Sequence, residues 1–260
     1  MSSWPVDIFT SSFGKFWFGS LTILYGISVW AYNHNLIQVQ LPKPTIRRWL
    51  VRWNVFISIV SGLGFWLVWR NFPGIGHVFR SDCISCEKAW VYDNWWDAHA
   101  GFLFMILKPV EFIDTIFLML NNKPISKLHW IHHITVTLFC WHCAVYANVQ
   151  TAGAMFALMN YFVHTVMYSY YAIRSMGINP SDYNIPINIS LIVTALQILQ
   201  MVAGLAIMVQ VGLRCDTNIC NPYNTIFGLC IYGTYFYLFM KYFINRYLFI
   251  KINQTNQTDT

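Results

Sequence analysis

Long apolar runs separated by short polar stretches dominate the hydropathy pattern of this chain. A helix needs roughly 20 mostly apolar residues to cross the hydrocarbon core of a membrane, which is about 30 Å thick. Seven runs approach or exceed that length, at approximately 16–33, 51–69, 98–120, 129–147, 152–172, 186–211 and 225–247. No small-residue cleavage site follows the first run, so we interpret it as a span rather than a signal peptide. The pattern predicts an all-α integral membrane protein with about seven transmembrane helices.

The composition supports lipid as the solvent of these helices. Hydrophobic residues make up 57% of the 260 residues and charged residues 10%, whereas soluble domains carry about 25% charged residues. The connections between the runs are short, which leaves no room for a soluble domain. We therefore expect one transmembrane domain over residues 1–260, with its function inside the membrane.

The loop charges predict an orientation, because basic residues collect on the cytosolic side of a membrane protein. With the N-terminus in the lumen, the cytosolic segments carry nine basic residues and two acidic ones, Asp182 and Asp259. The basic residues are Lys43, Arg47, Arg48, Arg52, Lys123, Lys127, Arg174, Arg246 and Lys251. The opposite side carries five basic and six acidic residues. This predicts a luminal N-terminus, a cytosolic C-terminus and a basic cytosolic mouth. The formal charge of +6 then reflects topology, and nucleic acid is not expected as a partner.

Four of the seven cysteines fall in the two predicted luminal loops that follow the second and sixth spans. Thiols oxidise in that compartment, so one or two disulfides are expected between Cys83 or Cys86 and Cys215 or Cys220. A zinc knuckle built from the same four residues is the alternative, because the first pair has C-x-x-C spacing. Spacing to the neighbouring motifs favours a Cys86–Cys220 disulfide.

Polar side chains inside the spans are the informative residues, since they are costly in lipid and usually face the bundle interior. Each of four spans carries a set of them at helical spacing. The sets are Lys108, Glu111, Asp114 and Thr115; His129, His132 and His133; Asn160, His164, Tyr168 and Tyr171; and Thr194, Gln197 and Gln200. At 1.5 Å per residue, one member of each set, namely Asp114, His132, His164 and Thr194, lies about 7–15 Å in from the cytosolic helix end. The polar sets of these four spans thus lie in the same half of the membrane and predict one buried polar chamber that opens to the basic side. The alternative is a purely structural polar core that joins helices by hydrogen bonds.

The histidines permit two kinds of chemistry. As metal ligands, with Glu111 and Asp114 added, they would hold one metal and hardly two, so no metal site is expected. Alternatively, burial favours the neutral imidazole, which is a competent nucleophile or base toward a thioester. Asp114 would then fix the tautomer of a histidine, and Asn160 or a tyrosine hydroxyl would hold a developing oxyanion.

Four motifs in this order resemble the fatty acid elongase (ELO) family over roughly residues 80–248. They are K-x-x-E-x-x-D-T at Lys108–Thr115, H-x-x-H-H at His129–His133, H-x-x-M-Y-x-Y-Y at His164–Tyr171 and T-x-x-Q-x-x-Q at Thr194–Gln200. The resemblance implies a multi-pass endoplasmic-reticulum enzyme whose helices enclose an acyl tunnel. Such enzymes condense acyl-CoA with malonyl-CoA, releasing carbon dioxide and forming a 3-oxoacyl-CoA. The form Leu128–His133 looks like the branch that acts on saturated and monounsaturated chains. A dilysine-type retrieval signal, common in the family, is not present in Asn253–Thr260.

The mechanism expected from this resemblance is ping-pong. His132 attacks the acyl-CoA, and His164, with Asn160 beside it, acts as base or stabilises the malonyl-derived enolate. His129 and His133 orient the site, while Glu111 and Asp114 set its electrostatics. The remaining candidates bind substrate, with the cationic ones apart from Lys108 placed at the CoA phosphates: Lys108, Tyr168, Tyr171, Gln197, Gln200, Lys123, Lys127, Arg174 and Lys241.

No resident cofactor is expected; the partners are acyl-CoA, malonyl-CoA, membrane lipid, a second copy of the chain and the ketoacyl reductase, dehydratase and enoyl reductase of the elongation cycle. Two other classes remain open at this point. A membrane di-iron desaturase or hydroxylase would need more histidine boxes than the sequence offers. A seven-helix transporter or receptor would need no catalytic cluster.

Overall fold

The computed structural model describes residues 11–38, 41–70, 72, 95–146, 151–179, 188–214 and 222–249. Its elements are α-helical apart from one closing π-helical turn: α2 Ser12–Asn33, α3 Lys43–Trp69, α5 Trp95–Val110, α6 Ile113–Leu120, α7 Lys127–Tyr146, α8 Thr151–Ser175, α9 Ile189–Arg214, α10 Pro222–Phe243 and η3 Ile244–Phe249. The described residues contain no strand, so the predicted all-α fold is confirmed.

Three helices in the described part of the chain are long and apolar enough to cross a membrane, namely Lys43–Trp69, Ile189–Leu213 and Pro222–Leu248. Six of the predicted spans each coincide with one helix, and 98–120 is divided between α5 and α6. Pro42 precedes α3 and a second proline stands in its first turn, where a missing N–H costs nothing. Gly177, with φ of +81°, follows the end of α8.

The division of the third span follows from Pro109, which lies inside α5 and has no N–H to donate to the preceding turn. Glu111 and Phe112 form a turn between the two helices. Phe112 N–H bonds Pro109 O at 3.2 Å and Asp114 N–H bonds Glu111 O at 3.1 Å, both tighter i to i−3 bonds. The break therefore falls within the K-x-x-E-x-x-D-T motif, and it turns Glu111 into the bundle.

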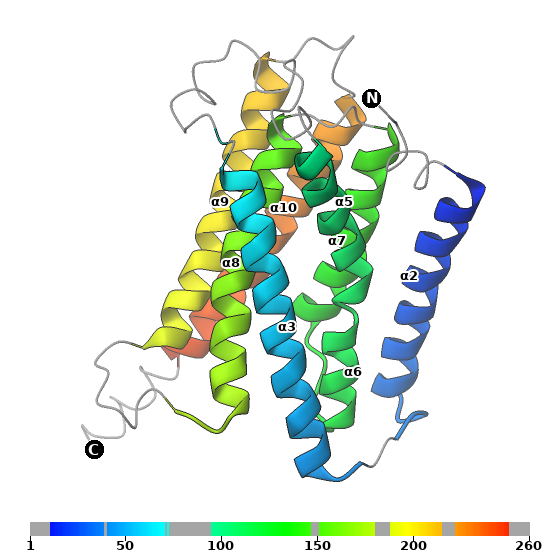
Figure 1. The fold of residues 1–260 in the computed structure, drawn as a ribbon, viewed down its shortest axis with the longest axis vertical. Helices are drawn as coiled ribbons and strands as arrows, with labels where there is room; N and C mark the ends of the chain where they lie inside the picture. The colour runs from blue at the N-terminus through cyan, green and yellow to red at the C-terminus, as the bar shows by residue number, and fades with distance from the viewer. Residues whose placement is uncertain are drawn as a thin grey trace.

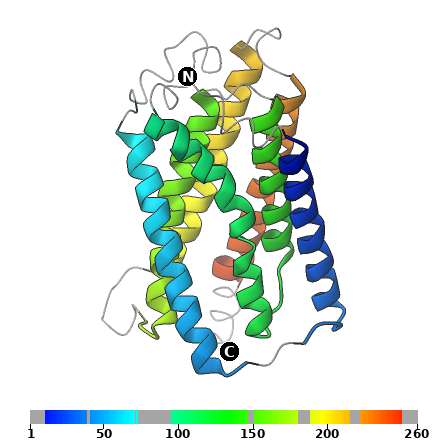
Figure 2. The ribbon, with the colours of Figure 1, turned by 45° about the vertical axis from the view of Figure 1, so that its right-hand side comes forward.

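The helices close into a ring with one helix outside it. Around the ring, α3 contacts α8, α8 contacts α9, α9 contacts α10, α10 contacts α7, α7 contacts α5, and α5 returns to α3. Helix α2 packs along the outer face of α7 and stands at the flank of the bundle in both ribbon views (Figures 1 and 2). The interior of the protein is therefore enclosed by the helices of the ring, and α2 packs against their outer side.

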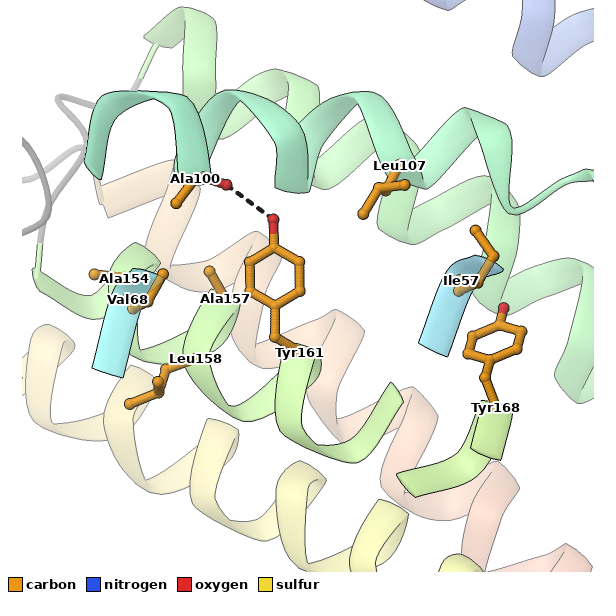
Figure 3. Packing of buried hydrophobic residues seen from close by; sticks show 9 residues of the cluster. All are labelled: Ile57, Val68, Ala100, Leu107, Ala154, Ala157, Leu158, Tyr161 and Tyr168. Atoms are coloured by element: carbon orange, nitrogen blue, oxygen red, sulfur yellow. Dashed lines mark hydrogen bonds between the residues drawn. The ribbon is translucent and has the colours of Figure 1, made fainter. Parts of the chain in front are cut away.

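Small residues set the spacing between α3, α5 and α8. Tyr161 is 1% exposed and donates its hydroxyl proton to Ala100 O at 2.9 Å, with Ala157 and Leu158 beside it (Figure 3). A Cβ added to Gly64 of α3 would lie 2.5 Å from carbons of the Tyr161 ring. Gly64 is therefore required for the close approach of α3 and α8.

We expect Gly64→Ala to destabilise the protein by about 1–3 kcal/mol, the usual effect of overpacking a core. Thermal unfolding in detergent measures this. The matched control is Gly233→Ala on α10, where an added Cβ meets nothing within 4 Å, and alanine in a helix is favoured by roughly 0.5–1 kcal/mol. Equal melting temperatures for the two variants would contradict this account of the α3–α8 contact.

Candidate active site

The ring encloses a polar cavity of about 880 Å³. Thirteen of the sixteen candidates line it, drawn from the α5–α6 region, α7, α8 and α9: Glu111, Asp114, Lys123, His129, His132, His133, Asn160, His164, Tyr168, Tyr171, Arg174, Gln197 and Gln200. Thr194 lines it as well. Twelve of the fourteen polar side chains expected to share one chamber therefore do so, whereas Lys108 and Thr115 do not line it.

A second, more apolar cavity of about 130 Å³ adjoins the polar one. Its walls include Phe104, Val136, Phe139, Phe156, Met208 and Tyr232. Four residues line both cavities: His132, Asn160, Gln200 and Met201. They mark the junction where polar surroundings give way to apolar ones.

The three histidines of α7 form a compact group. Ring centroids lie 4.4 Å apart for His129 and His133, and 5.6 Å apart for His132 and His133. The His132 ring also lies 4.8 Å from the Tyr235 ring, and the Tyr235 hydroxyl donates to His132 O at 3.3 Å. Neither ring nitrogen of His132 makes a hydrogen bond to another described residue, so its lone pair is available at the junction.

A buried ion pair links α5 to α8. Lys108 and Glu111 are each 1% exposed, and Lys108 Nζ lies 2.9 Å from Glu111 Oε1. Lys108 also donates to Asn160 Oδ1 at 2.8 Å. His164 Nδ1 lies 3.3 Å from the same Glu111 oxygen, which favours an N–H at Nδ1 and leaves Nε2 with its lone pair. Lys108 is thus held among these side chains, and it lines neither cavity.

The structure corrects the predicted partner of Asp114. Instead of a histidine, Asp114 accepts hydrogen bonds from Trp53 Nε1 at 2.6 Å and from the Tyr168 hydroxyl at 2.5 Å. The carboxylate beside an imidazole is Glu111, because the break after α5 turns it toward α8. Trp53 was missed, since nothing in the sequence distinguishes it from the other eleven tryptophans.

The basic end of the polar cavity is only partly as predicted. Lys123 and Arg174 line it, whereas Lys127 and Lys241 do not; Lys241 Nζ lies 6.0 Å from the Tyr237 ring centroid. The placement of Lys127 and Lys241 therefore does not support a role at this cavity. Arg246 and Tyr247 of η3 line the cavity and were not among the candidates. Tyr247 OH lies 2.6 Å from Ser190 Oγ and 3.3 Å from Thr194 Oγ1. The π-helical turn that aims them inward has no recognisable sequence pattern.

The donor atoms bear on the metal alternative. No group of three or more His, Cys, Asp or Glu side chains within the described ranges is arranged to hold a metal ion. The carboxylates of Glu111 and Asp114 already accept from Lys108, Trp53 and Tyr168. One oxygen of Glu111 and both oxygens of Asp114 are therefore already engaged by protein donors.

The predicted Cys86–Cys220 disulfide lies outside the described residues, as do Cys83 and Cys215, and it stays a prediction. Of the cysteines inside the helices, Cys140 and Cys143 are partly buried and line the apolar cavity, while Cys230 is exposed.

Lys108→Met should destabilise the protein by about 3–5 kcal/mol, because Glu111 would be left as an unpaired buried charge. The double variant Lys108→Met/Glu111→Gln should recover much of that loss. Thermal unfolding of both in the same detergent tests the pair. A single variant as stable as the wild type would show that the ion pair is not formed.

Comparison with known proteins places the whole site in one family. The model of the ELO family, described as GNS1/SUR4, matches residues 13–256. A Caenorhabditis elegans protein assigned as fatty acid elongase 3 is 36% identical over 75% of this chain and 60% of its own length. The very long chain fatty acid elongase 6 of Drosophila melanogaster is 34% identical over 80% of this chain and 65% of its own.

A third relative is the very long chain fatty acid elongase 3 of Mus musculus, 32% identical over 78% of this chain and 73% of its own length. The chain thus spans less than two thirds of the length of the nematode and fly relatives. The family match covers all four motifs and every described helix but for the first residue of α2. With its apolar helices and its enclosed histidine site, the chain belongs to the ELO (GNS1/SUR4) family of membrane proteins.

Proposed function

We propose that this protein is a fatty acid elongase, the condensing enzyme that joins a long-chain acyl-CoA to malonyl-CoA and yields a 3-oxoacyl-CoA and carbon dioxide. The observation that carries this is the place of His132, which lies where a polar and an apolar cavity meet and whose ring nitrogens make no hydrogen bond to a described residue. The names of the relatives point to the same reaction class.

The two cavities match the two halves of an acyl-CoA. The basic end of the polar cavity, with Lys123, Arg174 and Arg246, suits the phosphates of CoA. The apolar cavity suits the acyl chain. A thioester that joins the two halves would then lie at the junction, next to His132.

In the first step His132 attacks the thioester carbonyl carbon. A C–N bond forms, the C–S bond breaks, and the CoA thiolate leaves and takes up the proton that the imidazole loses, giving free CoA and an acyl-imidazole. The ring needs no reorganisation to do this, because no described side chain occupies its nitrogens. Its position is held through the backbone by the Tyr235 hydroxyl.

In the second step malonyl-CoA loses carbon dioxide, and the enolate carbon attacks the acyl-imidazole. A C–C bond forms, the C–N bond breaks, and the displaced His132 imidazolate takes up one proton from solvent. Asn160 is suited to stabilise the enolate oxygen, because Lys108 occupies its Oδ1 and so leaves its amide N–H groups to face the junction. His164 is held by Glu111 with Nε2 free, so it can accept or return a proton.

The acyl substrate would be saturated or monounsaturated, which rests on the Leu128–His133 sequence. We further propose an endoplasmic-reticulum location with a luminal N-terminus and a cytosolic C-terminus, supported by the loop charges. We also propose that the product passes to a ketoacyl reductase, a dehydratase and an enoyl reductase, and that the chain associates with a second copy of itself.

Incubating purified protein with acyl-CoA alone should release about one CoA per active site, because the acyl group remains on a side chain. Mass spectrometry should find the acyl group on a peptide containing His132. His132→Ala should abolish both results, while His34→Ala, at an exposed histidine at the end of α2, should change neither. Release of CoA only when malonyl-CoA is present would reject the covalent step and favour a ternary complex.

Elongation should be independent of metal, because imidazole rather than a bound ion performs the acyl transfer. Dialysis against EDTA should therefore leave malonyl-CoA-dependent product formation unchanged, and elemental analysis should find less than one iron or zinc per chain. Activity that is lost on dialysis and restored by one metal would support the di-iron alternative instead.

A further inference from the structure

Helix α2 contributes no residue to the wall of either cavity among the described residues. It packs outside the ring (Figure 2) through one narrow strip, in which Phe18, Thr22, Tyr25 and Val29 are 3–7% exposed. Its large residues Phe16, Ile23 and Trp30 point outward and are more than half exposed. Tyr25 lies in that strip, and its buried hydroxyl group needs a hydrogen-bond partner that apolar packing cannot supply.

The Tyr25 hydroxyl begins a buried hydrogen-bond chain that ends on the histidine motif. Tyr25 OH lies 2.9 Å from Thr115 Oγ1, and Thr115 Oγ1 lies 2.8 Å from His129 Nε2. Thr115 is 1% exposed, so water does not compete for its hydroxyl. The hydrogen bonds therefore run from α2, outside the ring of helices, through Thr115 of α6 to the His129 imidazole, which lines the polar cavity.

One assignment of donors and acceptors satisfies both hydrogen bonds best. The Thr115 hydroxyl has a single proton, and the lone pair of an imidazole nitrogen accepts it better than a phenol oxygen does. Tyr25 then donates to Thr115, and Thr115 donates to His129 Nε2. This order places the proton of a neutral His129 on Nδ1 and fixes the plane of its ring.

We propose that Tyr25 is a positioning residue for the active site, which acts through Thr115 to hold His129 in one tautomer and one orientation. His129 in turn packs against His133, with their centroids 4.4 Å apart, so the relay sets two of the three rings of the motif. The orientation of His129 and His133 matters for catalysis only if the proposed elongase function is correct. The relay itself can be tested without it.

The aromatic ring of Tyr25 has a separate role. It stacks on Phe112 with centroids 4.1 Å apart and planes 17° apart, directly at the break between α5 and α6. Phenylalanine at position 25 keeps this stacking and removes only the hydroxyl. Tyr25→Phe thus separates the relay from the packing, and Thr115→Val removes the middle of the relay with little change in shape.

The test compares Tyr25→Phe, Thr115→Val and the double variant with Thr22→Val, a matched control. Thr22 lies in the same buried strip, and its hydroxyl donates to Phe18 O within its own helix. Tyr25→Phe and Thr115→Val should each lower kcat for elongation by about three- to tenfold, with KM nearly unchanged. The double variant should lose no more than Thr115→Val alone, because both changes break one chain. Thr22→Val should match the wild type.

A second readout does not depend on activity. Diethyl pyrocarbonate acylates free imidazole nitrogens, and peptide mass spectrometry reports its rate at each histidine. Tyr25→Phe and Thr115→Val should speed modification of His129 by roughly threefold or more and leave His142 unchanged. The reason is that Thr115→Val removes the donor to Nε2, and Tyr25→Phe removes the hydrogen bond that orients that donor. Equal rates at His129 in all variants, or kinetic losses that multiply in the double variant, would overturn the proposal. If the wild-type protein elongates no acyl-CoA, but both variants still speed the modification of His129, the elongase function is rejected and the relay is supported.

Discussion

The buried ion pair between Lys108 and Glu111 is the interaction on which the site depends. Charges in a low-dielectric interior are tolerated only when they are paired and their remaining hydrogen-bonding capacity is used. Here the break after Pro109 lets Glu111 turn inward to meet Lys108, and the pair then binds Asn160 and His164 on α8. Two catalytic candidates are therefore positioned by the same requirement that keeps the charges stable. Loss of either charge would disturb both.

The ring of helices divides the interior by polarity. One part is lined by the histidine motif and the other polar candidates and includes the basic end, and the other part is lined mostly by apolar side chains. Such a division orients an amphipathic substrate without a dedicated binding motif, because each half of the ligand is solvated well in only one place. Under the proposed function it would also confine the reactive carbonyl to the junction, where His132, Asn160 and Gln200 are found.

Helical periodicity and depth predicted most of the side chains that share the chamber, though not the placement of Lys108 and Thr115 outside its lining, since a residue's face and its distance from the helix end follow from local geometry. They could not supply the partner of each side chain. Asp114 contacts Trp53 and Tyr168 because α3 and α8 are neighbours in the ring, and ring order is a tertiary property. Tyr25 and Tyr247 were missed for the same reason. Lys127 and Lys241 were overestimated because loop charge indicates a side of the membrane and not a direction of the side chain.

The hydrogen-bond partners also distinguish the four histidines of the chamber from one another. His129 is bonded to Thr115, and His164 lies against Glu111, so each has one nitrogen committed to a fixed neighbour. His133 is 6% exposed, its Nδ1 is buried without a partner in the described structure, and it lines the polar cavity but not the apolar one. His132 alone among these four lines both cavities and keeps both nitrogens free of described partners. A nucleophile needs an available lone pair at the place where the thioester lies, and a base needs a group that fixes its ring. By that criterion His132 is suited to act as the nucleophile and His164 to act as the base, while His129 supports the neighbouring His133 ring.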